Sequence, residues 1–137
     1  MTSVPASTLG KHVLADLHGI AADLLTQPQL IEQILLRAAQ TAGATPIFSK
    51  FHQFGEGQGV TGVLLLRESH ISIHTWPEHG FAAVDAFMCG DSRPELAIGI
   101  VQQAFKPQQS RIEEVLRGAL PLAKTMQLDS AVEAAIS

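Results

Sequence analysis

The sequence predicts an α+β protein, in which an antiparallel sheet has helices packed on one face, a two-layer sandwich in the order β-α-β-β-β-α-β. Two stretches repeat apolar residues at helical spacing, and the runs around them alternate or are continuously apolar. The short connections between the middle runs are typical of hairpins. With 137 residues, of which 46% are hydrophobic, residues 1–137 are expected to form a single domain.

The first half of the chain predicts a strand, a helix and a second strand. Residues 12–17 are a short strand candidate, and residues 26–43 follow as a helix whose first turn suits Pro28, because the missing N–H has no partner there. Gly43 is a natural stop for this helix. Its apolar face comprises Leu30, Ile31, Ile34, Leu35, Ala38 and Ala42. Residues 45–54 predict a strand, and residues 54–59, with glycine at three of six positions, predict a flexible loop.

The second half predicts further strands and a second helix. Residues 60–66 carry an apolar run, which indicates burial on both faces, and residues 70–75 continue extended until Pro77. Residues 81–89 form another strand, in which counting by two places five residues on one face: Phe81, Ala83, Asp85, Phe87 and Cys89. A helix over 92–105 and a weaker last strand over 111–117 follow, and residues 128–136 are expected either to form a short amphipathic helix or to fray.

Charge and composition argue against several classes of protein. Nine Lys and Arg against thirteen Asp and Glu give a net charge of −4, which disfavours nucleic acid or an anionic membrane as a partner. No apolar run approaches the roughly 20 residues of a membrane-spanning helix. The single cysteine, Cys89, excludes an internal disulfide and favours a reducing cytoplasm. A small open sheet with apolar edges favours a homodimer.

Reactive side chains are concentrated between residues 68 and 89, where they interrupt apolar strands. Buried polar groups of this kind need partners or a chemical role. A metal site is one hypothesis, but its candidate ligands match no usual metal-binding spacing, so no metal is expected; they are His70, His74, His79 and Cys89. A serine or cysteine hydrolase is disfavoured too. Ser69 lacks a Gly-x-Ser-x-Gly context, and Cys89 lies late in a strand.

Self-processing at the Glu68–Ser69 peptide is the third hypothesis. A serine at a strained peptide attacks the preceding carbonyl and turns the amide into an ester, after which a base removes the serine α-proton and elimination breaks the chain. Hydrolysis of the dehydroalanine leaves an N-terminal pyruvoyl group. Its ketone forms a Schiff base with an amine and acts as an electron sink for decarboxylation. The residues permit this chemistry without selecting it.

A family resemblance does select it. The run Glu-Ser-His-Ile-Ser-Ile-His-Thr-Trp-Pro-Glu over 68–78, followed by Ala-Ala-Val-Asp-Ala-Phe-Met-Cys-Gly over 82–90, resembles the signature of bacterial and archaeal S-adenosylmethionine decarboxylase proenzymes. The resemblance extends from about Leu9 to about Phe105 and includes Leu-Gly-Lys-His, Ala-Gly-Ala-Thr and Phe-His-Gln-Phe. It implies a pyruvoyl-dependent enzyme that releases CO2 from S-adenosylmethionine and supplies the aminopropyl donor for spermidine synthesis.

The resemblance also implies how the chain is processed and assembled. Ser69 matches the residue that becomes the pyruvoyl group, and Glu68 ends the released chain, so processing yields a β chain of residues 1–68 and an α chain of residues 69–137. Two processed protomers are expected to pair, with substrate sites at or near their interface.

Further residues match the family's functional positions. His74 matches the base of self-processing, Thr61 a hydroxyl that assists it, and Cys89 the proton donor to the product carbanion. Phe54 matches an aromatic position that stacks on adenine or faces the sulfonium, and Glu68 is expected to contact substrate as well.

The geometry of a strand raises a difficulty for this assignment. Strict alternation places Ser69 on one face and His74 on the other. A bulge or turn near residues 68–70 is therefore expected, so that His74 reaches the Ser69 α-carbon and the peptide is strained.

Arg67 departs from the family pattern, which commonly has a small residue there, and it demands a partner such as Glu68, Glu78 or a second protomer. An altered substrate therefore stays open: a pyruvoyl-dependent decarboxylase of ornithine or arginine. The more distant alternative is an unprocessed, non-catalytic relative. The neighbouring residues have plainer expected roles: backbone hydrogen bonding for Asp85, packing for Trp76, and orientation of neighbours or exposure for His70 and His79.

Overall fold

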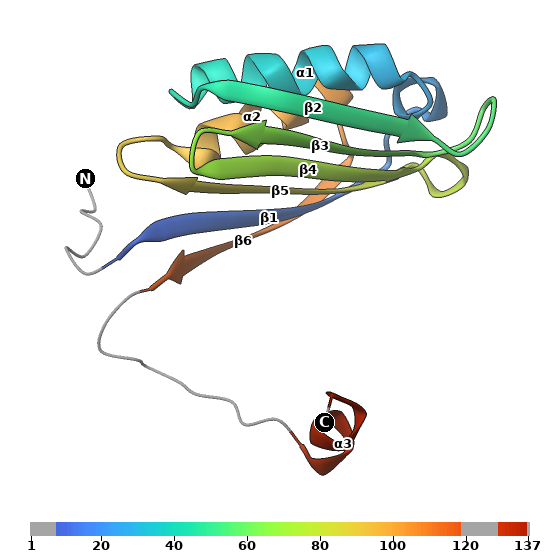
Figure 1. Cartoon of the computed structure of the whole chain (residues 1–137). Helices are drawn as coiled ribbons and strands as arrows, with labels where there is room; N and C mark the ends of the chain where they lie inside the picture. Colours follow the sequence, from blue (N-terminus) through green and yellow to red (C-terminus); the bar gives the residue numbers. More distant parts are fainter. Residues whose placement is uncertain (1–7, 119–128, 137) are drawn as a thin grey trace.

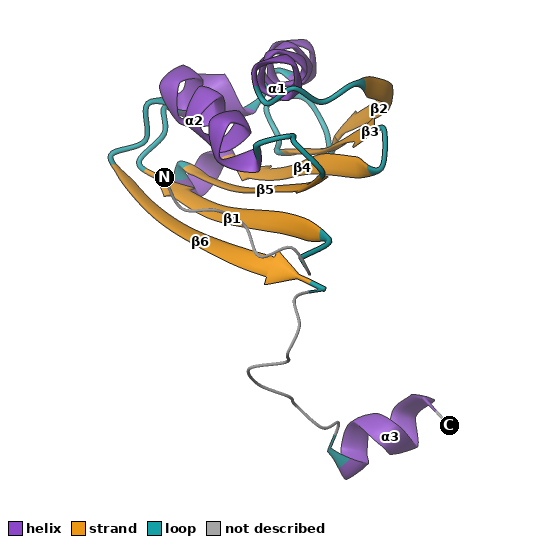
Figure 2. Cartoon of the chain, turned by 90° about the vertical axis from the view of Figure 1, so that its left-hand side faces the viewer, coloured by secondary structure: helices purple, strands orange, loops and turns teal. Residues whose placement is uncertain are grey.

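The computed structural model describes residues 8–118 and 129–136. Within them, six strands form one antiparallel sheet in the order β2-β3-β4-β5-β1-β6, and the helices α1 and α2 lie on one face of it (Figures 1 and 2). The α+β prediction is confirmed. The elements are β1 (Gly10–His18), η1 (Ala22–Leu25), α1 (Pro28–Thr41), β2 (Pro46–Gln53), β3 (Val60–Leu66), β4 (Ser69–Trp76), η2 (Pro77–His79), β5 (Phe81–Cys89), α2 (Pro94–Phe105), β6 (Gln109–Arg117) and α3 (Ser130–Ile136).

Both main helices begin at the proline that the sequence places in their first turn, and α1 ends just before the predicted stop at Gly43. Pro28 and Pro94 each occupy a first turn, and Gly43, with φ of 81°, follows the end of α1. One face of α1 is buried against the sheet through Ile31, Ile34, Leu35, Ala38 and Ala39. None of the described helices is both long and apolar enough to span a bilayer.

The predicted order of elements is wrong in one place, because four strands rather than three lie between α1 and α2. Arg67 and Glu68 form a tight turn that folds residues 60–76 into a hairpin of β3 and β4. Burial of residues 60–66 on both faces is also wrong. Alternate residues of β3 are buried, since helices cover only one face of the sheet.

The face without helices, called the open face below, carries the polar residues of the central strands. Along β5, buried Ala82, Val84, Ala86 and Met88 alternate with half-buried residues on the open face, which confirms the face predicted for Phe81, Ala83, Asp85, Phe87 and Cys89. Cross-strand pairing adds residues of neighbouring strands to this face: His12 in β1, Thr61 in β3, and His70, Ser72 and His74 in β4.

Thr75 fixes the register of β3 against β4. Its side chain is 6% exposed, and its hydroxyl accepts a hydrogen bond from the Val60 N–H and donates one to the Leu25 carbonyl, each at 2.8 Å. A buried hydroxyl with both partners satisfied orders the strands around it. The neighbouring pair Thr61 and His74 is thereby held in place on the open face.

Replacement of Gly10 and of Gly99 by alanine is expected to change the stability of the protein in opposite directions. A Cβ on Gly10 would lie 2.7 Å from the Phe87 ring, whereas a Cβ on Gly99 of α2 meets nothing within 4 Å. Gly10→Ala is expected to lower the free energy of unfolding by about 1–3 kcal/mol through overpacking, and Gly99→Ala to raise it by about 0.5–1 kcal/mol. Urea unfolding of both variants measures this. Equal shifts in one direction would contradict the packing at Gly10.

Candidate active site

The Glu68–Ser69 peptide lies in the turn between β3 and β4. Glu68 has φ of 63°, a left-handed conformation that costs a residue with a side chain roughly 1–2 kcal/mol. The expected irregularity at this peptide is confirmed. The turn is held from outside, because the Arg67 N–H donates to the Thr45 carbonyl at 2.9 Å. Within the described residues, the exposed Arg67 side chain has no ion pair.

Cys89, at the end of β5, contacts the same peptide. Its thiol donates to the Glu68 carbonyl oxygen across 3.3 Å, and the Ser69 hydroxyl donates to the Arg67 carbonyl at 3.3 Å. Three of the predicted site residues therefore lie close together: Ser69, expected to be the nucleophile, Glu68, whose carbonyl it would attack, and Cys89, expected to be the proton donor. A thiol hydrogen bond polarises the carbonyl that a nucleophile must attack.

Thr61 and His74 form a second group, across the β3–β4 pair. Thr61 Oγ1 lies 3.1 Å from His74 Nδ1, and the two residues are register partners. Phe54 follows β2 at the same end of the sheet, where its ring is 65% exposed and contacts His52. Trp76, expected to pack, is 40% exposed and stacks obliquely between His74 and Phe81.

The two groups lie at opposite ends of the hairpin. Leu66 pairs with Ser69 at one end and Thr61 with His74 at the other, a separation of five residues, or about 16 Å at roughly 3.3 Å per residue. Ser69 also shares its face with buried Ile71, whereas His74 is exposed on the open face. The expectation that a turn brings His74 to Ser69 is wrong: the turn exists, but His74 does not reach Ser69 within one chain.

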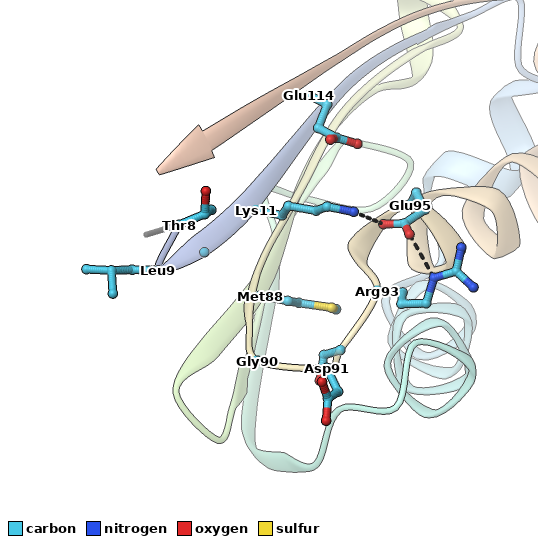
Figure 3. Close-up of a pocket in the computed structure, with 11 residues that line it drawn as sticks. Thr8, Leu9, Lys11, Met88, Gly90, Asp91, Arg93, Glu95 and Glu114 are labelled. Atoms are coloured by element: carbon cyan, nitrogen blue, oxygen red, sulfur yellow. Dashed lines mark hydrogen bonds and ion pairs between the residues drawn. The ribbon is translucent and has the colours of Figure 1, made fainter. Parts of the chain in front are cut away.

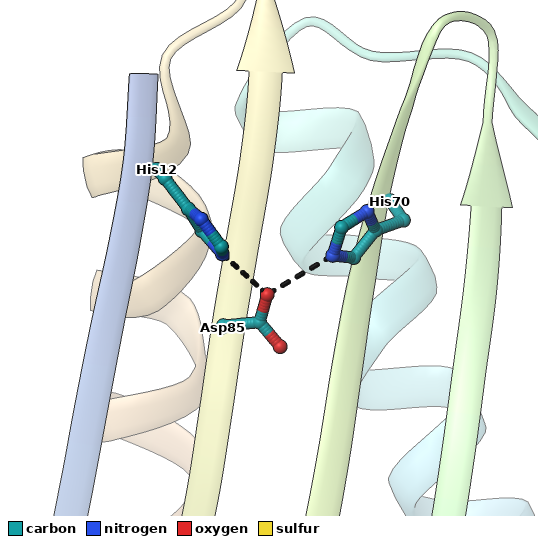
Figure 4. Close-up of side chains that lie close together, drawn as sticks. All are labelled: His12, His70 and Asp85. Carbon is teal, nitrogen blue, oxygen red and sulfur yellow. Dashed lines mark hydrogen bonds and ion pairs between the residues drawn. The ribbon is translucent and has the colours of Figure 1, made fainter. Parts of the chain in front are cut away.

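Asp85 is the centre of a third group on the open face, one that the sequence interpretation missed. His12 Nε2 lies 2.6 Å and His70 Nε2 3.0 Å from Asp85 Oδ2, and the Ser72 hydroxyl donates to Oδ1 (Figure 4). Burial raises the pKa of Asp85, but the hydrogen bonds from Ser72, His12 and His70 outweigh it, so the pKa is lowered. Asp85 was expected to bond to the backbone; its partners are side chains.

The residues that could hold a metal ion in the structure differ from those considered in the sequence. In the described part of the chain, the group close enough to share an ion is His12, His70 and Asp85, whose ligand atoms lie within 4.8 Å of one another. Of the four ligands considered from sequence, only His70 belongs to it. The signal for His12 was a histidine at the start of an apolar strand, in Leu-Gly-Lys-His.

One pocket in the described part of the chain lies on the helix side of the sheet (Figure 3). It has a volume of about 750 Å³ and is lined by Lys11, Arg93 and Glu95 among others. Glu95 pairs with Lys11 at 3.5 Å and with Arg93 at 2.9 Å. None of the residues that line it is a predicted site residue, although Met88 and Gly90 flank Cys89.

The sequence and the fold are both similar to those of known proteins. The family model described as S-adenosylmethionine decarboxylase matches residues 11–118. An S-adenosylmethionine decarboxylase proenzyme of Methanococcus maripaludis is 44% identical over 113 residues, covering 82% of this chain and 92% of that protein. The proenzyme of Aquifex aeolicus is 54% identical over 86 residues, or 63% of each chain. The crystal structure of the adenosylmethionine decarboxylase from Aquifex aeolicus superposes with a TM-score of 0.78 at 41% identity, covering 89% of this chain and all of the other.

Proposed function

The chain belongs to the S-adenosylmethionine decarboxylase family, and from that premise we propose that it is a self-processing, pyruvoyl-dependent decarboxylase of S-adenosylmethionine. The products are S-adenosylmethioninamine and CO2, and the former serves as aminopropyl donor for spermidine synthesis in the cytoplasm. The observation that carries the proposal is the Glu68–Ser69 turn, with a left-handed Glu68 and the Cys89 thiol on its carbonyl.

Self-processing begins at that carbonyl. The Ser69 hydroxyl, now on the Arg67 carbonyl, turns to attack the Glu68 carbonyl carbon, while the Cys89 thiol stabilises the negative charge on the oxygen. The C–N bond breaks and an ester forms on Ser69 Oγ. A base removes the Ser69 α-proton, and the Cβ–O bond breaks, so that Glu68 leaves as a carboxylate. Water then hydrolyses the dehydroalanine to the pyruvoyl group, and its nitrogen is released as ammonia.

The residues at this point fit a pyruvoyl group. Position 69 is the first residue of β4, and the Cys89 thiol lies 3.3 Å from the carbonyl oxygen of the preceding residue, Glu68. The group would supply a ketone able to bind the substrate α-amine and to accept the electrons released with CO2. Cys89 then donates its Sγ proton to the substrate carbon. Glu68 and Phe54 remain the proposed substrate contacts; because Phe54 lies at the His74 end of the sheet, its exposed ring would reach this site from the second protomer.

The base for this reaction has to come from elsewhere, and we propose that it comes from a second protomer. The open face leaves Thr61, His74 and Trp76 at one end of the sheet and the Glu68–Ser69 turn at the other. A two-fold axis between two open faces would set the partner's His74 and the partner's Thr61 against Ser69 and Cys89, once per protomer. The proposed homodimer would thus contain two sites, each built from both chains.

The denatured mass of the purified protein, with CO2 release from carboxyl-labelled substrates, tests the function. We expect two chains that break between Glu68 and Ser69, and release from S-adenosylmethionine at least about 100-fold above that from ornithine or arginine. Release from a basic amino acid instead would identify the alternative that the names of the relatives do not favour. An intact chain after long incubation would make it a non-catalytic relative.

A further inference from the structure

We propose that Asp85 is a positioning residue for self-processing: it holds His70 and Ser72, and so fixes the start of β4, where the Glu68–Ser69 peptide lies against Cys89. This inference rests on the proposed function and adds a requirement to it. In the described residues Asp85 makes no hydrogen bond or ion pair with Ser69 or Cys89, so it acts through His70, the residue that follows Ser69.

The direction of the Asp85 hydrogen bonds explains why this carboxylate matters. Ser72 is the direct register partner of Asp85, whereas His70 pairs with Phe87, so the link from Asp85 to His70 runs diagonally across the strands, toward the turn. Asp85 therefore ties β4 to β5 at two successive positions of one face. The more distant of the two, His70, is joined covalently to Ser69.

The contact between Arg117 and His12 determines which nitrogen of His12 carries the proton. Arg117 Nη1 lies 3.1 Å from His12 Nδ1, and because a guanidinium only donates, Nδ1 accepts and the His12 proton is on Nε2, facing Asp85. Asp85 thus receives one hydrogen bond from each of three side chains. Both of its oxygens act as acceptors, which requires the ionised carboxylate. Arg117 also lies 5.7 Å over the Phe87 ring, which His12 and His70 flank.

The same contact favours this network over a metal site. A divalent ion on His12 Nε2 would move the remaining proton to Nδ1, where it would meet the Arg117 donor. Without a metal, every contact of the network pairs a donor with an acceptor, from Arg117 in β6 to His70 in β4. The network thereby links four neighbouring strands, β4, β5, β1 and β6, close to the end of β5 where Cys89 lies.

The turn needs such a hold, because a left-handed Glu68 persists only where its surroundings fix it. The Thr45 carbonyl holds the β3 side through Arg67 N–H, and Asp85 holds the β4 side through His70. With Asp85→Asn, one amide oxygen remains for three donors, and the amide N–H2 faces a donor. The first residues of β4 are then free to shift away from Cys89.

The experiment follows the cleavage of freshly made proenzyme by denatured mass, well below the melting temperature of each variant. Asp85→Asn and His70→Gln are each expected to slow cleavage at least about tenfold, and the double variant no more than about twofold further, because both changes break one link. Asp85→Glu, which keeps the charge and both acceptors, should restore the rate to within about threefold of the original protein. Asp23→Asn, which alters an exposed carboxylate in η1, outside the sheet, with no side-chain hydrogen bond or ion pair in the described residues, is the control and should cleave normally.

Each other result overturns the inference in a distinguishable way. Cleavage of Asp85→Asn at the normal rate, or a rate that falls only in step with melting temperature across all variants, would remove the positioning role and leave the proposed function intact. Cleavage that stops with EDTA and returns with Zn²⁺ alone would replace the network by a metal on His12, His70 and Asp85. Failure of the unaltered protein to cleave would remove the proposed function, and the positioning role with it.

Discussion

Replacement of Ser69 by alanine is expected to leave one uncleaved chain with no decarboxylase activity. The hydroxyl is the only group at this position that attacks the Glu68 carbonyl, and without it neither the ester nor the ketone forms. Cleavage and CO2 release should both fall by more than about 1,000-fold, to the background of the assays. The denatured mass and CO2 release from labelled S-adenosylmethionine measure the two losses separately.

Ser92→Ala is the matched control for this experiment. The Ser92 hydroxyl donates to the Gly43 carbonyl at 3.2 Å, on an exposed segment before α2, so its loss should cost no more than about 1 kcal/mol of stability and leave cleavage unchanged. Cleavage of Ser69→Ala at the same peptide would show that a different group, or another protein, breaks the chain.

His74→Ala and Ser69→Ala chains are expected to rescue each other when they are refolded together. Each variant alone should remain intact, since His74→Ala lacks the base and loses about 100-fold or more in rate. In a mixed dimer, one site combines Ser69 and Cys89 of the His74→Ala chain with the partner's His74 from the Ser69→Ala chain. Random pairing puts about half of the His74→Ala chains in mixed dimers, so about half should be cleaved.

The design separates an intermolecular site from an intramolecular one. Only the His74→Ala chain should yield fragments, and a mixture of His74→Ala with a chain altered at both Ser69 and His74 should yield none. Absence of rescue in a confirmed mixed dimer would mean that His74 serves Ser69 of its own chain. That would require the β3–β4 hairpin, which spans about 16 Å between the two groups, to refold.

Features that depend on neighbours in the chain could be predicted from the sequence. The apolar spacing of α1, with Pro28 at its start and Gly43 past its end, specifies a helix in any surroundings. The alternation along β5 placed Asp85 and Cys89 on one face, and the structure has them there. The reactive segment over 68–89 and its family resemblance were also evident without coordinates, and the comparisons confirm the family.

Other features depend on which strands become neighbours. The Arg67–Glu68 turn contains no glycine, proline or asparagine, so no local signal divided residues 60–76 into two strands. His12 and Asp85 are 73 positions apart, and they meet because β1 lies between β5 and β6. Nothing in the spacing of the chain specifies that pairing.

The fold class, the family and most of the candidate site residues could be predicted from the sequence alone, because periodicity and motif are properties of a short stretch of chain. The tertiary structure alone decided which of these residues meet: Cys89 with the Glu68 carbonyl, His70 with Asp85, and His74 with Thr61 rather than Ser69. The physical reason is register. A strand moves each side chain by about 3.3 Å per residue and alternates its face, so proximity is set by cross-strand pairing and not by distance along the sequence.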